Sequence, residues 1–308
     1  MVRILFVILC DWLLTKNTAA QSYYFYDDRH YQSSLVLELG TGAGIMNAFT
    51  DLGGRKGVGK KFIKDLNWKN ARPCFTFYTT ALYKNIVGLR LQVSLGQVSA
   101  ADSILKPVKG STSGRYERNL SFRSVIKEII LAAEIYPLSF RNYALSDKDA
   151  SLFSPYLVAG IGYFSFDPQA KWKGRWYSLQ PLHTEGQGFA NYPDRKPYSL
   201  QQWNVAAGAG FRYELSALFN LRLEIIHRFL ATDYLDDVSL DQYIDPSLFL
   251  QNLPPGEAAL ALHLSDRRAE LDPGTSSGLP EQRGNPRNKD AYFTLQFHLG
   301  LLLGRTRR

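Results

Sequence analysis

The sequence predicts an all-β protein, an eight-stranded antiparallel transmembrane β-barrel with short periplasmic turns and long extracellular loops. Three observations lead to this expectation. Apolar and polar residues alternate in eight segments, as they do where successive side chains of a strand point to opposite faces. The polar positions repeatedly hold Glu and Arg, which can pair inside a narrow lumen. The chain also begins with a segment that resembles a secretory signal peptide.

Residues 1–20 have the layout of such a signal. Arg3 supplies an early positive charge, an apolar stretch covers 4–14, and Thr18 and the two alanines after it are small enough for cleavage. We therefore expect the processed protein in the outer membrane of a Gram-negative cell. The expected divisions are a signal peptide at 1–20, a periplasmic N-terminal segment at 21–33 and an outer-membrane barrel at 34–308.

Composition narrows the class of the 308-residue chain further. After residue 20, no stretch approaches the roughly 20 apolar residues of a membrane helix, so the chain spans a membrane as a barrel or not at all. The net charge of +8 suits outer-membrane lipids and lipopolysaccharide. We expect no nucleic-acid partner, because no RNP, helix-turn-helix or zinc-finger spacing is present. If Cys10 leaves with the signal, Cys74 is alone and no intrachain disulfide can form.

The first four segments place apolar residues on one face and polar or small residues on the other. Segment 35–45 alternates Leu with Glu and Gly, and 74–82 alternates Phe with Thr and Tyr. Segment 89–96 follows a tight turn and alternates Leu and Val with Arg, Gln and Ser. Segment 118–136 alternates Ile and Leu with Ser and Glu. Only Lys127 interrupts its apolar face, and we expect it at the membrane edge, where its stem can snorkel.

The last four segments repeat the pattern. Segments 156–166 and 203–215 place Gly opposite aliphatic and aromatic residues, 220–229 alternates Leu, Ile and Phe with Arg and Glu, and 291–303 alternates Phe and Leu with Thr, Gln and His. Short and long connections alternate between the segments, as in outer-membrane barrels, although 137–154 is a long inner connection. Within the last long loop, we expect Pro- and Gly-rich mobile parts and a short helix or hairpin at 258–264.

Nine charged residues fall on the polar faces of these segments. Five acids and four arginines nearly balance, which a narrow interior requires because an unpaired buried charge is costly. About eight strands leave room for side chains but not for an open pore. The predicted lumen charge network consists of Glu38, Arg90, Glu128, Glu134, Arg212, Glu214, Arg222, Glu224 and Arg228.

Two glycine-rich motifs suggest other chemistry. LVLELGTGAGI at 35–45 is similar to motif I of S-adenosylmethionine-dependent methyltransferases, but Gly53 and Gly54 would break the helix that should follow. A methyltransferase is therefore a remote alternative. GRKGVGK at 54–60 lacks the Ser or Thr of a phosphate-binding loop. We expect a solvated basic loop there, with contact to lipopolysaccharide phosphates as a hypothesis.

No catalytic, cofactor-binding or metal-binding residue is predicted. The five histidines lack metal-ligand spacing, and His298 is interpreted as a hydrogen-bonded lumen side chain rather than a catalytic one. The aspartates between 233 and 241 could bind calcium but lack an EF-hand pattern, so calcium binding stays an open possibility.

Several motifs carry a resemblance to a known family. They are TDYLDDVSLDQY at 232–243, RGNP at 283–286, a DxYFxLxFxL strand from 290 and PYLVAGIGYFSF at 155–166. In these the chain resembles the barrel family that includes PorG, outer-membrane components of the Bacteroidota type IX secretion system. It departs from the family pattern at Leu240, where Gly is usual.

The resemblance implies an eight-stranded, OmpA-like barrel that is an accessory or anchoring subunit of type IX secretion. It also implies association with the periplasmic ring made of the PorK lipoprotein and PorN. The alternative is a barrel of the same fold with a structural or surface-adhesion role. Because a ring in the periplasm can reach only the inner rim, we expect the contact at Arg141, Asn142 and Tyr143 and at 23–31. The family-motif loop contains Asp233, Tyr234, Asp236 and Asp237.

Overall fold

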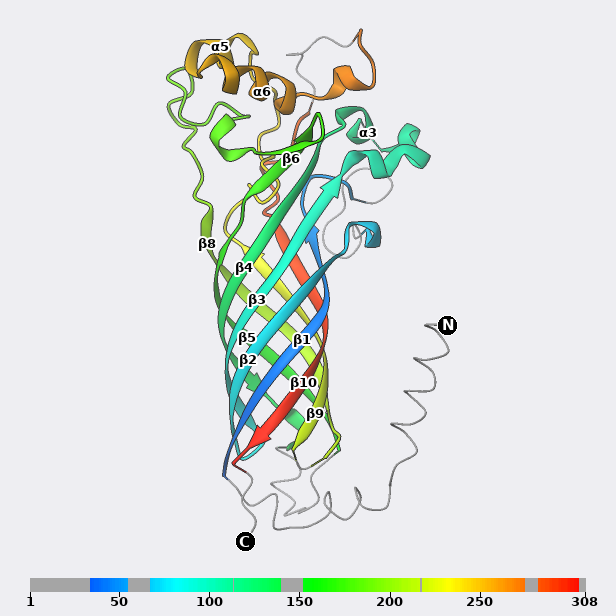
Figure 1. Ribbon diagram of the computed structural model, residues 1–308, viewed down its shortest axis with the longest axis vertical. Helices are drawn as coiled ribbons and strands as arrows, with labels where there is room; N and C mark the ends of the chain where they lie inside the picture. Colours follow the sequence, from blue (N-terminus) through cyan, green and yellow to red (C-terminus); the bar gives the residue numbers. More distant parts are fainter. Residues whose placement is uncertain are drawn as a thin grey trace.

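The computed structural model describes residues 34–54, 67–112, 114–139, 152–216, 218–274 and 282–304. Eight antiparallel strands follow one another in the order β3-β2-β1-β10-β9-β8-β5-β4, and β3 pairs with β4 to close the ring. Figure 1 shows them tilted around a long axis, with helices gathered at one end. The barrel strands are β1 (Leu35–Phe49), β2 (Arg72–Tyr83), β3 (Val87–Ala101), β4 (Ser121–Ile135), β5 (Phe153–Ser165), β8 (Gln201–Glu214), β9 (Phe219–Leu230) and β10 (Ala291–Leu303).

This closed barrel confirms the predicted fold class. It also shows that the methyltransferase interpretation of 35–45 is wrong, because this segment lies in β1, which pairs antiparallel with β2 and with β10. A cofactor-binding unit of that kind needs a parallel strand followed directly by a helix. Strands β1 and β3 continue outward beyond the predicted segments. The alternation fades there, where η3 (Trp68–Asn70) packs against both strands, and Val98, Ser99 and Ala100 are buried in succession.

The outward face of the barrel carries a continuous apolar band between two belts of aromatic residues. Tyr213 and Trp203, both exposed, lie ten residues apart on β8, which is roughly 33 Å along a strand. A strand tilt of about 40° reduces this to a height of ~25 Å, the usual height of the lipid-facing band. The inner belt contains Tyr83, Phe153, Phe211, Tyr213 and Phe219, and the outer belt contains Trp68, Tyr163, Trp203 and Phe229.

One predicted boundary is wrong. Segment 118–136 was expected to be strand from its start, but Arg118 ends the short helix α3 (Arg115–Arg118), and β4 begins at Ser121. Asn119 between them adopts the left-handed conformation, with φ 56°, which Asn tolerates and a strand excludes. The side chain of Arg118 pairs with Asp102 and does not face the lumen of the barrel.

The outer loops carry more regular structure than their sequences indicate. An unexpected hairpin, β6 (Pro168–Trp172) and β7 (Arg175–Ser178), extends the sheet beyond β4 through the pair Arg123 and Gln169. Lys173 and Gly174 turn it with positive φ, the mark of a tight hairpin turn. The outer end also contains η3 (Trp68–Asn70), η4 (Asp102–Ser111), η5 (Gln180–Leu182), α5 (Ser247–Asn252), α6 (Pro255–Ser265) and η6 (Arg268–Glu270).

We call the hairpin β6–β7 together with η5, α5, α6 and η6 the cap. Helix α6 includes the stretch 258–264, for which a short helix or hairpin was expected. The cap has its own apolar core, separate from the two clusters inside the barrel. That core contains Ala170, Leu179, Leu182, Phe189, Ile244, Leu248, Phe249, Ala258, Ala261 and Leu264.

Two short connections lie at the opposite, inner end of the barrel. Lys84 and Asn85 turn between β2 and β3 with φ of 51° and 55°, and the amides of Leu215 and Ser216 donate to the carbonyl of Phe219 between β8 and β9. Among the described residues, no helix has the length and apolar character needed to cross a membrane. The predicted signal peptide, the segment 21–33, most of the connection 137–154 and the basic loop 55–66 lie outside those residues.

Candidate functional site

The inner half of the lumen is crossed by a chain of alternating charges. Arg222 of β9 donates to Glu38 of β1 and, over 3.0 Å, to Oε1 of Glu134 on β4. Glu134 also pairs with Arg90 of β3, whose Nη1 lies 2.7 Å from Oε2 of Glu224 on β9. All five side chains are at most 2% exposed. The chain therefore joins strands on opposite sides of the lumen, and side chains rather than water fill its cross-section.

Tyrosines complete this chain. The hydroxyls of Tyr78, Tyr136 and Tyr156 donate to Glu38, Glu134 and Glu224 over 2.6, 2.6 and 2.7 Å. The guanidinium of Arg222 also lies 5.2 Å from the ring centres of Tyr78 and Tyr156. A planar guanidinium stacks well on an aromatic ring, and this contact stabilises a positive charge that water cannot reach. The list of lumen residues predicted from charge missed these tyrosines, although their positions on the polar faces of the strands would have identified them.

A second network lies nearer the outer mouth. Arg228 and Glu128 pair at 3.1 Å, and Arg228 also donates to Oγ1 of Thr294 over 2.6 Å. Glu128 accepts from Tyr292 over 2.7 Å and from Asn204 over 2.8 Å. Both oxygens of the Glu128 carboxylate thus accept hydrogen bonds from side chains of the barrel wall. The side chains around Glu128 and Arg228 therefore form a second seal across the lumen.

The remaining predicted pair, Arg212 and Glu214, lies at the inner end of β8, 3.4 Å apart. The guanidinium of Arg212 also lies over the ring of Tyr136, 4.7 Å from its centre. The structure therefore places all nine predicted charges in the lumen, in one chain of five, one outer pair and one inner pair. His298, on the same face, is 1% exposed, and its Nε2 lies 3.6 Å from Oε1 of Glu224.

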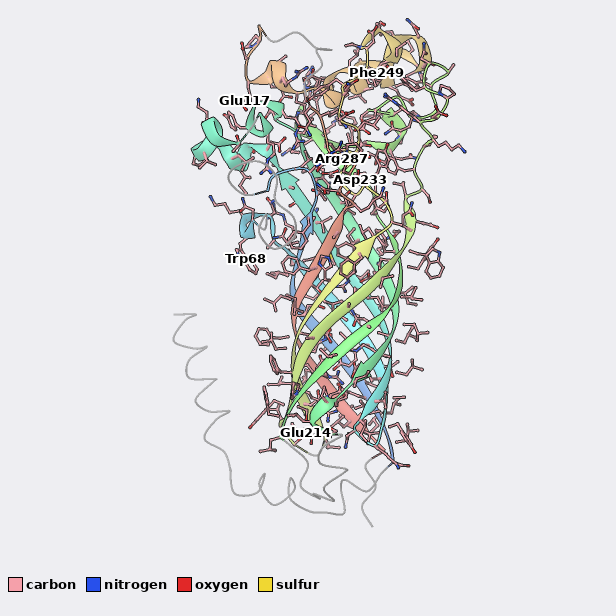
Figure 2. All side chains as sticks on the ribbon, turned by 180° about the vertical axis from the view of Figure 1, so that it is seen from behind. Trp68, Glu117, Glu214, Asp233, Phe249 and Arg287 are labelled. Atoms are coloured by element: carbon pink, nitrogen blue, oxygen red, sulfur yellow. The ribbon has the colours of Figure 1, made fainter. Side chains whose placement is uncertain are left out.

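Above the lumen, the family-motif loop closes the outer mouth of the barrel. Asp233, Asp236 and Asp237 are at most 4% exposed, and Figure 2 shows Asp233 between the barrel and the cap. Oδ1 of Asp237 accepts from the hydroxyl of Tyr198 over 2.7 Å, and its other oxygen accepts from Thr184. The loop is therefore an internal plug and not a mobile surface loop.

Two of the motifs that carry the family resemblance, 232–243 and 283–286, contact each other at this plug. Arg283, from the RGNP motif, donates to the Asp237 carbonyl over 3.1 Å and pairs with the carboxylate of Glu185. Glu185 in turn accepts from the backbone N–H of Leu240 over 3.0 Å. Gly284 leaves no room for a side chain, since an added Cβ would lie 2.8 Å from Cγ1 of Val238. Leu240 does not have positive φ, so it needs no glycine there.

A second buried arginine fastens η4 and β1 to the plug. Arg118 lies 2.8 Å from Oδ2 of Asp102 and donates to the carbonyls of Asp51 and Arg283. Asp102 also accepts from the amides of Gly53 and Leu120. Sequence reasoning missed this pair, because Asp102 begins η4 and Arg118 ends the four-residue α3, where no extended periodic pattern indicates which side chains turn inward.

Carboxyl groups at the mouth outnumber the cations that face them. Burial raises the pKa of Asp51 to about 6 and the pKa values of Asp233 and Asp237 to about 7. Burial, followed by repulsion from neighbouring aspartates, raises the pKa values of Asp236 and Asp290 well above their usual range. The plug therefore holds protons near neutral pH that the unfolded chain would release.

No metal centre is evident at the mouth. Among the residues that the structure describes, no group of three or more His, Cys, Asp or Glu side chains is arranged to hold a metal ion. The aspartates of segment 232–243 form no such group. Cys74 is buried as a free thiol. The predicted partner contacts Arg141, Asn142 and Tyr143 lie outside the described residues.

The fold and site together define a transmembrane β-barrel of eight strands with a filled lumen. No known family profile matches the chain, and no curated protein matches it. Its similarity is to solved outer-membrane barrels. They include the attachment invasion locus protein Ail of Yersinia pestis in complex with the heparin analogue sucrose octasulfate, with 8% identity, TM-score 0.38, and 88% of this chain and 100% of that chain covered.

Two further barrels are similar. One is the N-terminal β-barrel domain of Pseudomonas aeruginosa OprF, with 8% identity, TM-score 0.30, and 88% of this chain and 98% of that chain covered. The other is Neisserial surface protein A, with 8% identity, TM-score 0.33, and 87% and 97% covered. A likeness at this level says nothing about what the present protein does.

Proposed function

We propose that the protein is a non-enzymatic outer-membrane barrel that acts as a PorG-like accessory or anchoring subunit of type IX protein secretion and contacts a periplasmic ring. One observation carries the anchoring role. The chain of charges from Glu38 to Glu224 fills the inner lumen, and the buried loop 232–239 plugs the outer mouth. A barrel filled in this way offers partners its two ends and its outer wall, not a passage.

The location in the outer membrane is supported by the exterior. An exposed apolar band of ~25 Å between two aromatic belts matches the lipid-facing surface of outer-membrane barrels. Burial of this band in lipid accounts for the many leucines, valines and aromatic residues that the barrel exposes. The signal-like start at 1–20 supports the same route.

The secretion role is supported by the family resemblance. The matched motifs at 232–243 and 283–286 are not scattered, because Arg283 and Gly284 pack directly on Asp237 and Val238. Motifs that form one structural unit are a stronger resemblance than motifs that only occur in the same order. Within this proposal, the ring docks on the inner rim at Arg141, Asn142 and Tyr143 and at 23–31, and lipopolysaccharide surrounds the outer wall.

The proposal is tested by replacing 141–143 with Gly-Ser residues and measuring both ring co-purification and cargo secretion. We expect both to fall while the barrel still inserts. A matched control replaces the inner turn residues Lys84 and Asn85 by the turn pair Asn-Gly, and should retain both. If ring co-purification survives the 141–143 replacement, this rim is not the docking surface. If deletion of the whole protein leaves secretion intact, the secretion role is wrong.

A surface-adhesion or structural role is the second candidate, and the cap favours it. The cap has a core of its own, and it presents Leu250 and Trp176 to the outside, 65% and 39% exposed. Adhesion predicts that replacing 246–272 by a short linker abolishes binding of cells to a host surface but leaves secretion unchanged. The type IX proposal predicts instead that changes at the inner rim reduce secretion, whereas replacement of 246–272 leaves secretion unchanged.

A further inference from the structure

The outer wall of the barrel carries charge at one place only. All eight barrel strands are described in full, and their outward positions hold just two residues among Lys, Arg, Asp and Glu. Both are cations on β4, Arg123 and Lys127, on the same face as the exposed Val125 and Ile129. The other seven strands present only apolar and uncharged residues outward.

These two cations lie just above the outer aromatic belt. Lys127 is paired in register with Ser165, one outward pair beyond Ile129 and Tyr163, and Tyr163 packs on Trp203 with ring centres 5.0 Å apart. Arg123 is four residues further out, roughly 13 Å along the strand. The aromatic belt marks the boundary of the hydrocarbon layer. Both cations therefore lie at the level of lipid headgroups.

The hairpin β6–β7 extends this surface outward. Arg123 pairs in register with Gln169, and Lys171 lies on the same face of β6, directly across from Trp176. The guanidinium of Arg123 lies 3.8 Å from the ring centre of Trp176, which is 39% exposed. Lys127, Arg123 and Lys171 thus form a basic row with a flat indole beside it, and we call it the wall row.

Other charges near the wall row only partly offset it. Asp167 directly precedes β6, and its Oδ2 accepts from Gln169 over 2.7 Å and from Ser178 over 3.0 Å. Above Ser121, Arg267 and Glu270 pair with each other at 2.9 Å and so contribute no net charge. The exposed ammonium groups of Lys127 and Lys171 have no carboxylate partner among the ion pairs of the described residues.

We propose that the wall row is a binding site for the phosphorylated saccharide headgroup of a glycolipid in the outer leaflet. This inference relies on the proposed membrane location. Cations that face the lipid at headgroup height recognise lipid phosphates, and the indole of Trp176 offers a face on which a sugar ring stacks. A lipid held here would fix the rotation of the barrel in the membrane and brace the hairpin that supports the cap.

The test uses the full barrel in phosphatidylcholine nanodiscs that contain lipid A as the probe. The triple variant Arg123→Gln, Lys127→Gln, Lys171→Gln should retain lipid A at least about tenfold less than the natural protein does. The matched control, Lys106→Gln, Lys109→Gln, Arg287→Gln, removes the same charge from exposed residues of η4 and of the segment after RGNP, and should retain lipid A unchanged. Dephosphorylated lipid A should bind the natural protein as weakly as lipid A binds the triple variant.

Each of the following results would overturn the proposal. Equal loss in both triple variants would show attraction by net charge, equal binding of dephosphorylated lipid A would show that phosphate is not recognised, and displacement by millimolar inorganic phosphate would show a free-anion site. Heat-modifiable migration on gels is recorded for every variant. A folded, inserted barrel that fails to bind lipid A removes this inference alone, whereas failure to insert at all removes the membrane location.

Discussion

At the residue scale, the lumen charges act as members of one network. Glu224 illustrates this, because it is 2% exposed and accepts from both Arg90 and Tyr156. Its position was predictable from the alternation in 220–229, but its partners were not. Arg90 lies on β3, which is not a neighbour of β9 in the sheet. Pairing across a barrel depends on how far each strand is shifted along its neighbours, and the alternation of residues does not encode that shift.

Removal of Glu224 tests this network. Glu224→Ala should lower the free energy of unfolding by roughly 3–5 kcal/mol, because it leaves Arg90 buried without half of its charge compensation. Urea unfolding in lipid vesicles measures the change. Glu117→Ala removes an exposed carboxylate of α3 and should change the unfolding energy by less than about 0.5 kcal/mol. Equal stability of Glu224→Ala and the natural protein would mean that water reaches this face.

Gly284 supplies a second residue-scale test. An added Cβ would lie 2.8 Å from Cγ1 of Val238 and 3.0 Å from the Leu240 carbonyl oxygen, so Gly284→Ala should overpack the plug and destabilise it by roughly 1–3 kcal/mol. Gly274→Ala is the control, because its added Cβ would meet only Oδ1 of Asp272 at 3.4 Å. Limited proteolysis of the cap should accelerate for Gly284→Ala alone.

At the element scale, the barrel strands were predictable and the cap was not. Each strand repeats its alternation over eight or more residues, whereas β6 and β7 have five and four residues, too few to establish a pattern. The helix at 258–264 was recognisable only as an apolar stretch. Its apolar residues lie all around the helix, although only those on one side, Ala258, Ala261 and Leu264, are buried in the core of the cap.

The plug should weaken as pH rises. Unfolded aspartates have pKa values near 3.9, and burial raises those of Asp51 to about 6 and of Asp233 and Asp237 to about 7. The folded plug therefore binds more protons than the unfolded chain, and its stability falls between about pH 4 and pH 7. Hydrogen exchange of 232–239 should be slower at pH 5 than at pH 8, after correction for intrinsic rates. Asp233→Asn should reduce this difference, and a plug that exchanges more slowly at pH 8 would contradict the assignment.

At the scale of the whole molecule, the protein is a rod of sheet with two different ends. One end carries a cap with an independent core, and the other carries the short turns that join β2 to β3 and β8 to β9. The seals within the lumen lie between them at two levels, one around Arg222 and one around Arg228. Since both levels are built from the barrel wall itself, the closed state of the lumen does not depend on the cap.

This independence leads to a prediction about conductance. The natural protein in a planar bilayer should show no ion-conducting steps, because the ion pairs of Glu38, Arg222, Glu134 and Arg90 occupy the lumen. A variant with 246–272 replaced by a short Gly-Ser linker should be equally silent, since it keeps both seals. An open porin in the same bilayer serves as the positive control. Conductance steps in the shortened variant alone would place the seal in the cap, and steps in the natural protein would show that the lumen is a water-filled path, which removes the observation on which the anchoring role depends.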